Sequence, residues 1–273
     1  MNPKRRPRIK ELRTKGIYIL PNLFTSGNLF CGFFSAISSL GGRFEVAAMA
    51  ILFATVFDCL DGKLARLTKT TSRFGVEYDS LSDVVSFGMA PGLLIYAWAL
   101  NAYGRLGWVA AFLFMVCGAL RLARFNVQVS GVESKDFVGL PIPAAAGFLA
   151  TWVLLDGYIF NFGKDVRPGV ILAVTYVLAF LMVSSLRYRS FKEFNLKNRK
   201  PFSVLVSLVL VLLVLVNAPQ IMLFSLFALY CSSGILEKPI QWLYQFIRKS
   251  KDHLPRELDR GDIEDKKNFL KHD

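Results

Sequence analysis

The residues of this chain best suited to chemistry are four aspartates, which occur as two pairs. Asp58 and Asp61 are three positions apart, and Asp79 and Asp83 are four positions apart. On a helix, either spacing places both carboxylates of a pair on one face, about 5–6 Å apart between Cβ atoms. If the two helices lie side by side, the four carboxylates converge on one site.

Both aspartate pairs adjoin long apolar runs, and this position indicates a functional role. A charged side chain at mid-bilayer depth costs roughly 2.5–3.5 kcal/mol, so such residues normally mark a functional site. Divalent cations would relieve the mutual repulsion of the carboxylates, and Mg²⁺ or Mn²⁺ binds oxygen ligands that substrate phosphates often complete. The aspartates therefore predict a site for two divalent cations, Mg²⁺ or Mn²⁺, and a phosphorylated substrate.

Histidine and cysteine contribute little to the expected chemistry. The two histidines, His253 and His272, lie in the polar C-terminal stretch, so we expect carboxylates to carry out proton transfer. The four cysteines lie in or beside apolar runs without the paired spacing of a zinc site or a disulfide framework. We expect the cysteines to pack against other apolar side chains.

The composition is that of a membrane protein. Of the 273 residues 53% are apolar, and the mean hydropathy is +0.42. Several runs of about 16–22 apolar residues are long enough to span, or nearly span, a bilayer core. We therefore predict an all-α, polytopic membrane protein with about eight transmembrane helices, at residues 20–40, 44–60, 77–100, 108–122, 144–160, 169–186, 202–216 and 220–236.

The distribution of basic residues predicts the orientation of these helices. The net charge is +13, which alone would also suit a nucleic-acid partner. However, 29 of the 33 Lys and Arg residues lie in alternate connections and at the termini, and only 4 lie in the other connections. Cytoplasmic loops carry such an excess of basic residues. We expect no nucleic-acid partner, and we expect both termini and the aspartate site on the cytoplasmic side of the cell membrane.

Three regions follow from this layout. Residues 1–18 form a basic cytoplasmic arm with seven basic residues and one acid, and no cleavage site of a signal peptide follows it. Residues 19–236 form the transmembrane catalytic domain. Residues 237–273 form a cytoplasmic charged tail. The arm is also expected to attract anionic membrane lipid.

The aspartates belong to a longer pattern, D-x2-D-G-x2-A-R-x8-G-x3-D-x3-D, which starts at Asp58 and is matched at every fixed position. This pattern resembles the signature of the CDP-alcohol phosphatidyltransferases. The resemblance implies a six-helix catalytic core of that family. It also implies that Asp58, Asp61 and Asp79 hold two divalent ions. Asp83 would contact the second ion and act as the general base.

The same resemblance implies which residues bind the CDP-linked lipid. Gly62, Arg66 and Ser72 would contact it, and Gly75 would admit the nucleotide. An arginine can pair with phosphate through two donors, although Arg66 would also suit an ordinary anchor at the membrane edge. On the first helix we add two candidates, Thr25 and Asn28, whose small polar side chains would alternatively serve helix packing.

Three further stretches resemble the phosphatidylserine synthase branch of the family: residues 119–126, 137–145 and 185–192. That branch transfers a phosphatidyl group from CDP-diacylglycerol to the hydroxyl of L-serine and releases CMP. The carboxylate of serine would need a cation, which Arg121 or Arg124 could supply. Both arginines would equally suit anchors at a helix end. A homodimer is a further expectation from the family.

Three alternatives remain open. The same site would serve another acceptor, such as glycerol 3-phosphate, inositol phosphate or an amino alcohol. The lipid donor could also be of the archaeal type instead of CDP-diacylglycerol. A cation transporter is a different class, but it predicts acids near the membrane midplane, often in the paired halves of a repeat. Here the aspartates lie at one membrane edge, next to Arg66.

Overall fold

The fold was analysed in a computed structural model, which describes residues 7–68, 72–129, 137–160, 168–188 and 218–234. The chain divides into two compact units, Met1–Ser232 and Ser233–Asp273. Only residues 233 and 234 of the second unit are among those described, where they end a helix. The first unit contains the whole aspartate pattern.

The first half of the chain forms three long helical stretches. The first is α1 (Pro7–Leu40), and the second is α2 (Phe44–Leu67). The third starts as α3 (Arg73–Asp83), passes through a π-helical segment, η1 (Val84–Met89), and continues as α4 (Ala90–Trp98). The wider π turns immediately precede Pro91, which has no amide hydrogen to donate to the preceding turn.

The rest of the described chain is also mainly helical. A short 3₁₀ helix, η2 (Leu100–Tyr103), leads into α5 (Arg105–Val129). Then follow α6 (Ile142–Leu155), the π-helical segment η3 (Asp156–Phe160) and α7 (Pro168–Val183). A last helix covers residues 219–234.

The predicted fold class, an all-α membrane protein, is confirmed. Among the described residues, length and composition select three stretches able to cross a membrane, Leu20–Leu40, Arg73–Trp98 and Arg105–Gln128. Two shorter apolar helices cover Ile142–Tyr158 and Gly169–Val183. The predicted helix at 202–216 and the charged tail at 237–273 lie outside the described residues, so the number of spans stays a prediction.

Several predicted helix ends differ from those observed. α1 starts at Pro7 and so includes most of the basic arm. α2 continues seven residues beyond the predicted end at residue 60, to Leu67. α3 starts at Arg73 instead of residue 77, because Ser72 caps its first turn by accepting a hydrogen bond from the Gly75 amide. The extension of α2 places Asp58 and Asp61 within the helix instead of at its predicted end.

Two short strands were not predicted. β1 (Phe137–Val138) pairs in antiparallel fashion with β2 (Arg187–Tyr188). Gly139 then donates to the carbonyl of Leu186, and Leu140 donates to the carbonyl of Leu181. The pairing joins the stretch that follows α5 to the stretch that follows α7. Two of the three stretches that resemble the phosphatidylserine synthase branch are thereby brought together.

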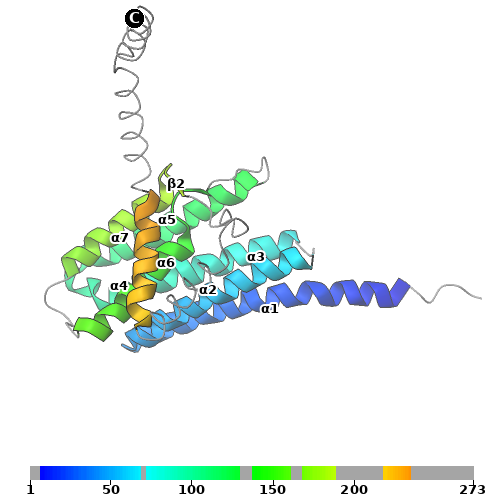
Figure 1. Cartoon of the computed structure of the whole chain (residues 1–273), viewed down its shortest axis with the longest axis horizontal. Helices are drawn as coiled ribbons and strands as arrows, with labels where there is room; N and C mark the ends of the chain where they lie inside the picture. The colour runs from blue at the N-terminus through cyan, green and yellow to red at the C-terminus, as the bar shows by residue number, and fades with distance from the viewer. Residues whose placement is uncertain (1–6, 69–71, 130–136, 161–167, 189–217, 235–273) are drawn as a thin grey trace, which may run out of the picture. The chain divides into compact units, whose positions relative to one another are not determined.

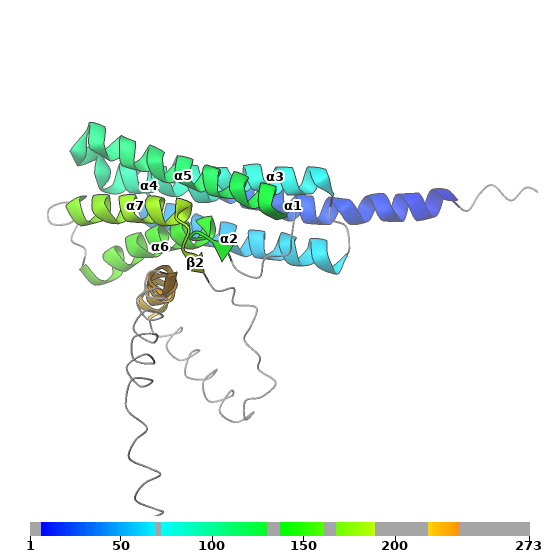
Figure 2. The ribbon, with the colours of Figure 1, turned by 90° about the horizontal axis from the view of Figure 1, so that it is seen from above.

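α1 and α2 pack against each other, and α2 also contacts α6. α1 lies along α2 and also contacts α3, η1 and α4, while α5 packs on α7 (Figures 1 and 2). In both views the N-terminal part of α1 extends beyond the ends of α2 and α3. Small residues allow this close approach: Ala47, Ala48 and Ala54 of α2 are fully buried. At Gly32, a Cβ atom would lie 2.6 Å from the Cα of Ser86, so the backbones of α1 and η1 touch.

Candidate active site

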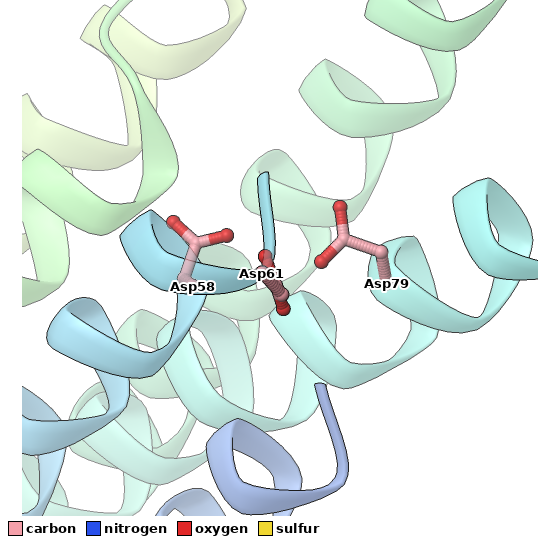
Figure 3. A group of neighbouring side chains, drawn as sticks. All are labelled: Asp58, Asp61 and Asp79. Carbon is pink, nitrogen blue, oxygen red and sulfur yellow. The ribbon is translucent and has the colours of Figure 1, made fainter. Parts of the chain in front are cut away.

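Three of the four aspartates form a compact cluster. Asp58 and Asp61 lie toward the C-terminal end of α2, and Asp79 lies on α3. One carboxylate oxygen from each residue lies within 4.8 Å of those of the other two. Figure 3 shows Asp61 between Asp58 and Asp79. The predicted convergence of two helices on one acidic site is therefore present in the structure.

Asp83 lies beside this cluster, one helical turn beyond Asp79 on α3. Its side chain is only 7% exposed, and its charge interacts with those of the other three aspartates. The amide nitrogen of Asn28 donates a 3.1 Å hydrogen bond to its Oδ1 atom. The four aspartates are thus arranged as a cluster of three plus one neighbour with a different environment.

α1 holds two of these carboxylates through neighbouring turns. The Thr25 hydroxyl donates to Asp61 Oδ2 at 3.0 Å, and Asn28 donates to Asp83. Because these two donors are three positions apart, they lie on one face of α1. The serines of α3 and η1 fix the same turns, since Ser82 donates to the carbonyl of Thr25 and Ser86 to that of Asn28. The sequence analysis did not identify Ser82 and Ser86, although their i,i+4 spacing marks one helix face.

A cavity of about 270 Å³ opens next to the cluster. It contains seven of the residues predicted to bind metal or the CDP-linked lipid: Thr25, Asp61, Gly62, Arg66, Ser72, Gly75 and Asp79. Pro21 and Asn22 of α1, Ala65 of α2 and Val76 of α3 complete its wall. Asn22 was not among the predicted site residues. Its polar side chain three positions before Thr25 was the available signal.

The cavity presents polar groups with little bulk. The Arg66 Nε atom donates to the carbonyl of Gly62 at 2.8 Å, which folds this exposed side chain back along α2. The Ser72 hydroxyl accepts from the Gly75 amide. At Gly75, a Cβ atom would lie 3.1 Å from Ser72 Oγ and 3.4 Å from Asn22 Oδ1. Glycine at this position keeps room between α1 and α3.

The remaining predicted residues lie elsewhere. Asp58, Asp83 and Asn28 are not in the wall of the cavity. Arg121 of α5 is 7% exposed, and its charge and that of Asp83 are close enough to interact, whereas Arg124 is exposed. Arg121 also lies over the Phe125 ring, with 5.9 Å between Cζ and the ring centroid. The structure therefore separates two arginines that the sequence left equivalent.

The acidic cluster fits a divalent metal ion. Three carboxylates from two helices offer oxygen atoms alone, which are the ligands that Mg²⁺ and Mn²⁺ prefer. Asp61 is 5% exposed, and Asp58 and Asp79 are half-buried. Three like charges held this close and partly out of water repel one another unless a cation lies among them. The cluster can hold metal, and the adjoining cavity can admit a phosphorylated molecule.

Comparison with known proteins agrees with this geometry. The model of the CDP-alcohol phosphatidyltransferase family matches residues 18–183. A CDP-diacylglycerol–serine O-phosphatidyltransferase of Helicobacter pylori is 39% identical over 235 residues, which cover 85% of this chain and 94% of that protein. The protein of the same name in Bacillus subtilis is 32% identical over 179 residues, 66% of this chain and 94% of that protein.

A third relative has another name. The archaetidylserine synthase of Methanothermobacter thermautotrophicus is 38% identical over 171 residues, 62% of this chain and 69% of that protein. The family match covers α2 to α7 completely, together with the part of α1 that reaches the cavity. With the complete aspartate signature and its convergence on one cavity, these matches confirm the resemblance: the chain belongs to the CDP-alcohol phosphatidyltransferase family.

Proposed function

We propose that this protein is an enzyme of phospholipid biosynthesis that transfers a phosphatidyl group from CDP-diacylglycerol to L-serine, with phosphatidylserine and CMP as products. The observation that carries the proposal is the similarity to serine phosphatidyltransferases over 85% of the chain. The cluster of Asp58, Asp61 and Asp79 beside a cavity supports it, because that chemistry needs metal-binding carboxylates next to a nucleotide site.

The four aspartates would hold two divalent cations, Mg²⁺ or Mn²⁺. Asp58, Asp61 and Asp79 provide most of the ligands, and Asp83 contributes to the second ion. When bound, the ions supply positive charge that stabilises the diphosphate and the leaving CMP. Thr25 supports this role, since its hydroxyl donates to Asp61 Oδ2 and so orients this carboxylate.

The cavity would bind the CDP part of the donor. Gly62 and Gly75 leave space for it, and Thr25 and Ser72 offer hydroxyl groups. Arg66 would turn from the Gly62 carbonyl toward a phosphate, for which its planar guanidinium provides two donors. The acyl chains would stay in the bilayer.

Asp83 would act as the general base. The serine hydroxyl transfers its proton to Asp83, and its oxygen forms a bond to the lipid-side phosphorus. The bond from this phosphorus to the oxygen of CMP breaks, and CMP leaves with the electron pair. Since Asn28 donates to Oδ1 of Asp83, the second oxygen remains for the proton. This role requires the serine hydroxyl to bind within about 3 Å of that oxygen. Arg121, which is buried and interacts with Asp83, suits the serine carboxylate better than the exposed Arg124.

We also propose a multi-pass arrangement in the cytoplasmic membrane, with both termini and the site on the cytoplasmic side. The excess of Lys and Arg in alternate connections supports this orientation. Free serine and CTP-derived nucleotides occur on that side. A homodimer is expected from the family.

One measurement tests the acceptor. Purified protein with CDP-diacylglycerol and Mg²⁺ or Mn²⁺ is assayed for CMP release with L-serine, glycerol 3-phosphate, inositol phosphate or no acceptor. We expect release that depends on serine, with phosphatidylserine as the lipid product. Release with a different acceptor would retain the metal site and refute serine. If no CMP is released under any of these conditions, the proposed enzymatic activity is refuted.

An archaeal-type donor is the second candidate, favoured by the archaetidylserine synthase relative. The same assay with a CDP-linked ether lipid measures the preference between donors. A kcat/KM at least about tenfold higher for the diacyl donor supports the main proposal, and the reverse ratio supports the ether lipid.

A further inference from the structure

Three buried polar side chains from three helices lie near the aspartate cluster: Asn28 on α1, Asp83 on α3 and Arg121 on α5. Their exposed fractions are 0%, 7% and 7%. Asn28 donates to Asp83, and Arg121 lies close enough to Tyr230 and to Asp83 to interact electrostatically with both. We call these three residues the inner polar group. They are not in the wall of the cavity next to the aspartates.

Two atoms of the inner polar group have no hydrogen-bond partner among the described residues: Asn28 Oδ1 and Arg121 Nε. Buried polar atoms without partners are costly, and native proteins keep few of them. A carboxylate only accepts hydrogen bonds, so the amide nitrogen of Asn28 faces Asp83 and its oxygen remains an acceptor. A guanidinium is a cation and a donor only. The group therefore offers one unused acceptor and one unused cationic donor beside a carboxylate.

The surrounding structure holds Asn28 in place. Ser86 donates to its carbonyl at 2.9 Å, and Ser82 donates to the carbonyl of Thr25 one turn earlier. Gly32 lets α1 approach the Ser86 backbone of η1 closely, because a Cβ atom at this position would lie 2.6 Å from the Cα of Ser86. The unused oxygen of Asn28 is therefore a fixed feature of the interface between α1 and η1.

We propose that the inner polar group is the subsite for a zwitterionic acceptor, with Asn28 as its ammonium ligand. The Asn28 Oδ1 atom accepts a hydrogen bond from the ammonium, Arg121 pairs with the carboxylate, and Asp83 takes the hydroxyl proton. The inference rests on the proposed transfer to serine and names the residues that select it. Asn28, which the sequence suggested as a ligand of the CDP-linked lipid, thereby belongs to the other substrate.

The same arrangement disfavours phosphorylated acceptors. Glycerol 3-phosphate has hydroxyl and phosphate groups, but it has no ammonium to donate to Asn28 Oδ1. Its phosphate is a dianion, and Arg121 is the cation that the inner polar group provides. An ammonium and a single carboxylate match the two unused atoms in number and in sign.

Acceptor analogues test the proposal on the unmodified protein. 3-Hydroxypropionate lacks the ammonium of serine, and ethanolamine lacks the carboxylate. With CDP-diacylglycerol and Mn²⁺, we expect kcat/KM for L-serine to exceed that for each analogue by at least about tenfold, because each analogue leaves a buried charged or polar group unpaired. Equal values for serine and 3-hydroxypropionate would overturn the role of Asn28.

Variants then assign each contact. In Asn28→Ala we expect KM for serine to rise at least about tenfold, while KM for 3-hydroxypropionate changes less than threefold. In Arg121→Ala we expect KM for serine to rise at least about tenfold, while KM for ethanolamine changes less than threefold. Ser39→Ala is the control on α1, because it removes another buried polar side chain, whose hydroxyl donates to the Ser35 carbonyl of the same helix. KM for CDP-diacylglycerol is measured throughout.

The outcomes separate this inference from the proposed function. If the unmodified protein releases no CMP with serine, the transfer to serine itself is refuted. If serine is used but Asn28→Ala raises KM for serine and 3-hydroxypropionate by the same factor, Asn28 acts only by orienting Asp83, and the subsite is refuted. If Asn28→Ala does not fold, the analogue series on the unmodified protein still decides.

Discussion

The substitution Asp83→Asn tests the assigned general base most directly. It replaces one carboxylate oxygen by an amide nitrogen at nearly constant volume, and Asn28 can still donate to the remaining oxygen of residue 83. Asparagine does not accept the hydroxyl proton. Because general-base catalysis contributes about 10²–10⁴-fold, we expect kcat to fall by that factor, which equals about 3–5 kcal/mol of transition-state free energy.

The assay follows CMP release under single-turnover conditions, so that product release does not limit the rate. Binding of the CDP-linked lipid is measured separately, and we expect its Kd to change less than about threefold, because Asp83 is not in the wall of the cavity. Glu77→Gln is the matched control, since it removes an exposed carboxylate from the same helix, α3. A turnover rate for Asp83→Asn within threefold of the unmodified protein would refute Asp83 as the base.

Three other perturbations follow from the same geometry. Asp61→Asn removes a ligand from the acidic cluster, so we expect Mn²⁺ affinity, measured by electron paramagnetic resonance, to fall at least about tenfold, and unchanged affinity would contradict the metal site. Thr25→Val removes the hydrogen-bond donor to Asp61 at similar side-chain volume, and we expect Mn²⁺ affinity to fall about tenfold with the fold retained. Thr55→Val is the control, because the Thr55 hydroxyl bonds within α2, and an equal loss of affinity in this variant would indicate a nonspecific effect. Gly32→Ala should destabilise the protein by about 1–3 kcal/mol in thermal or denaturant unfolding, because the added Cβ would lie 2.6 Å from Ser86 Cα. Gly41→Ala serves as the control, because a Cβ atom at that position would have its nearest neighbour at 3.5 Å.

The spacing of the aspartates was sufficient to predict two acidic helix faces, and their convergence followed once the two helices lay side by side. A helix fixes which side chains share its face, so two pairs at i,i+3 and i,i+4 already define two acidic faces. Local sequence did not define the helix ends as well. Ser72 was interpreted as a substrate ligand, and its capping bond to Gly75, which moves the start of α3, became visible only in the structure.

The environments of the aspartates depend on neighbouring helices. Asp61 and Asp83 receive hydrogen bonds from α1, which lies 36 and 55 residues away along the chain. Periodicity says which face of α1 carries Thr25 and Asn28, but the rotation of α1 about its axis results from packing against α2 and η1. The close approach of Gly32 to Ser86 is part of that packing, and no local pattern predicts it.

The sequence by itself determined the class of the protein and the chemistry of its site. Long apolar runs can bury their backbone polar groups in a bilayer only as helices, and carboxylates at fixed spacing select hard cations. Only the tertiary structure decided how the polar residues divide among roles. It separated Asp83 from the other aspartates, buried Arg121 while exposing Arg124, and directed Asn28 toward Asp83. These assignments depend on how helices distant in sequence pack, and helical periodicity carries no information about that.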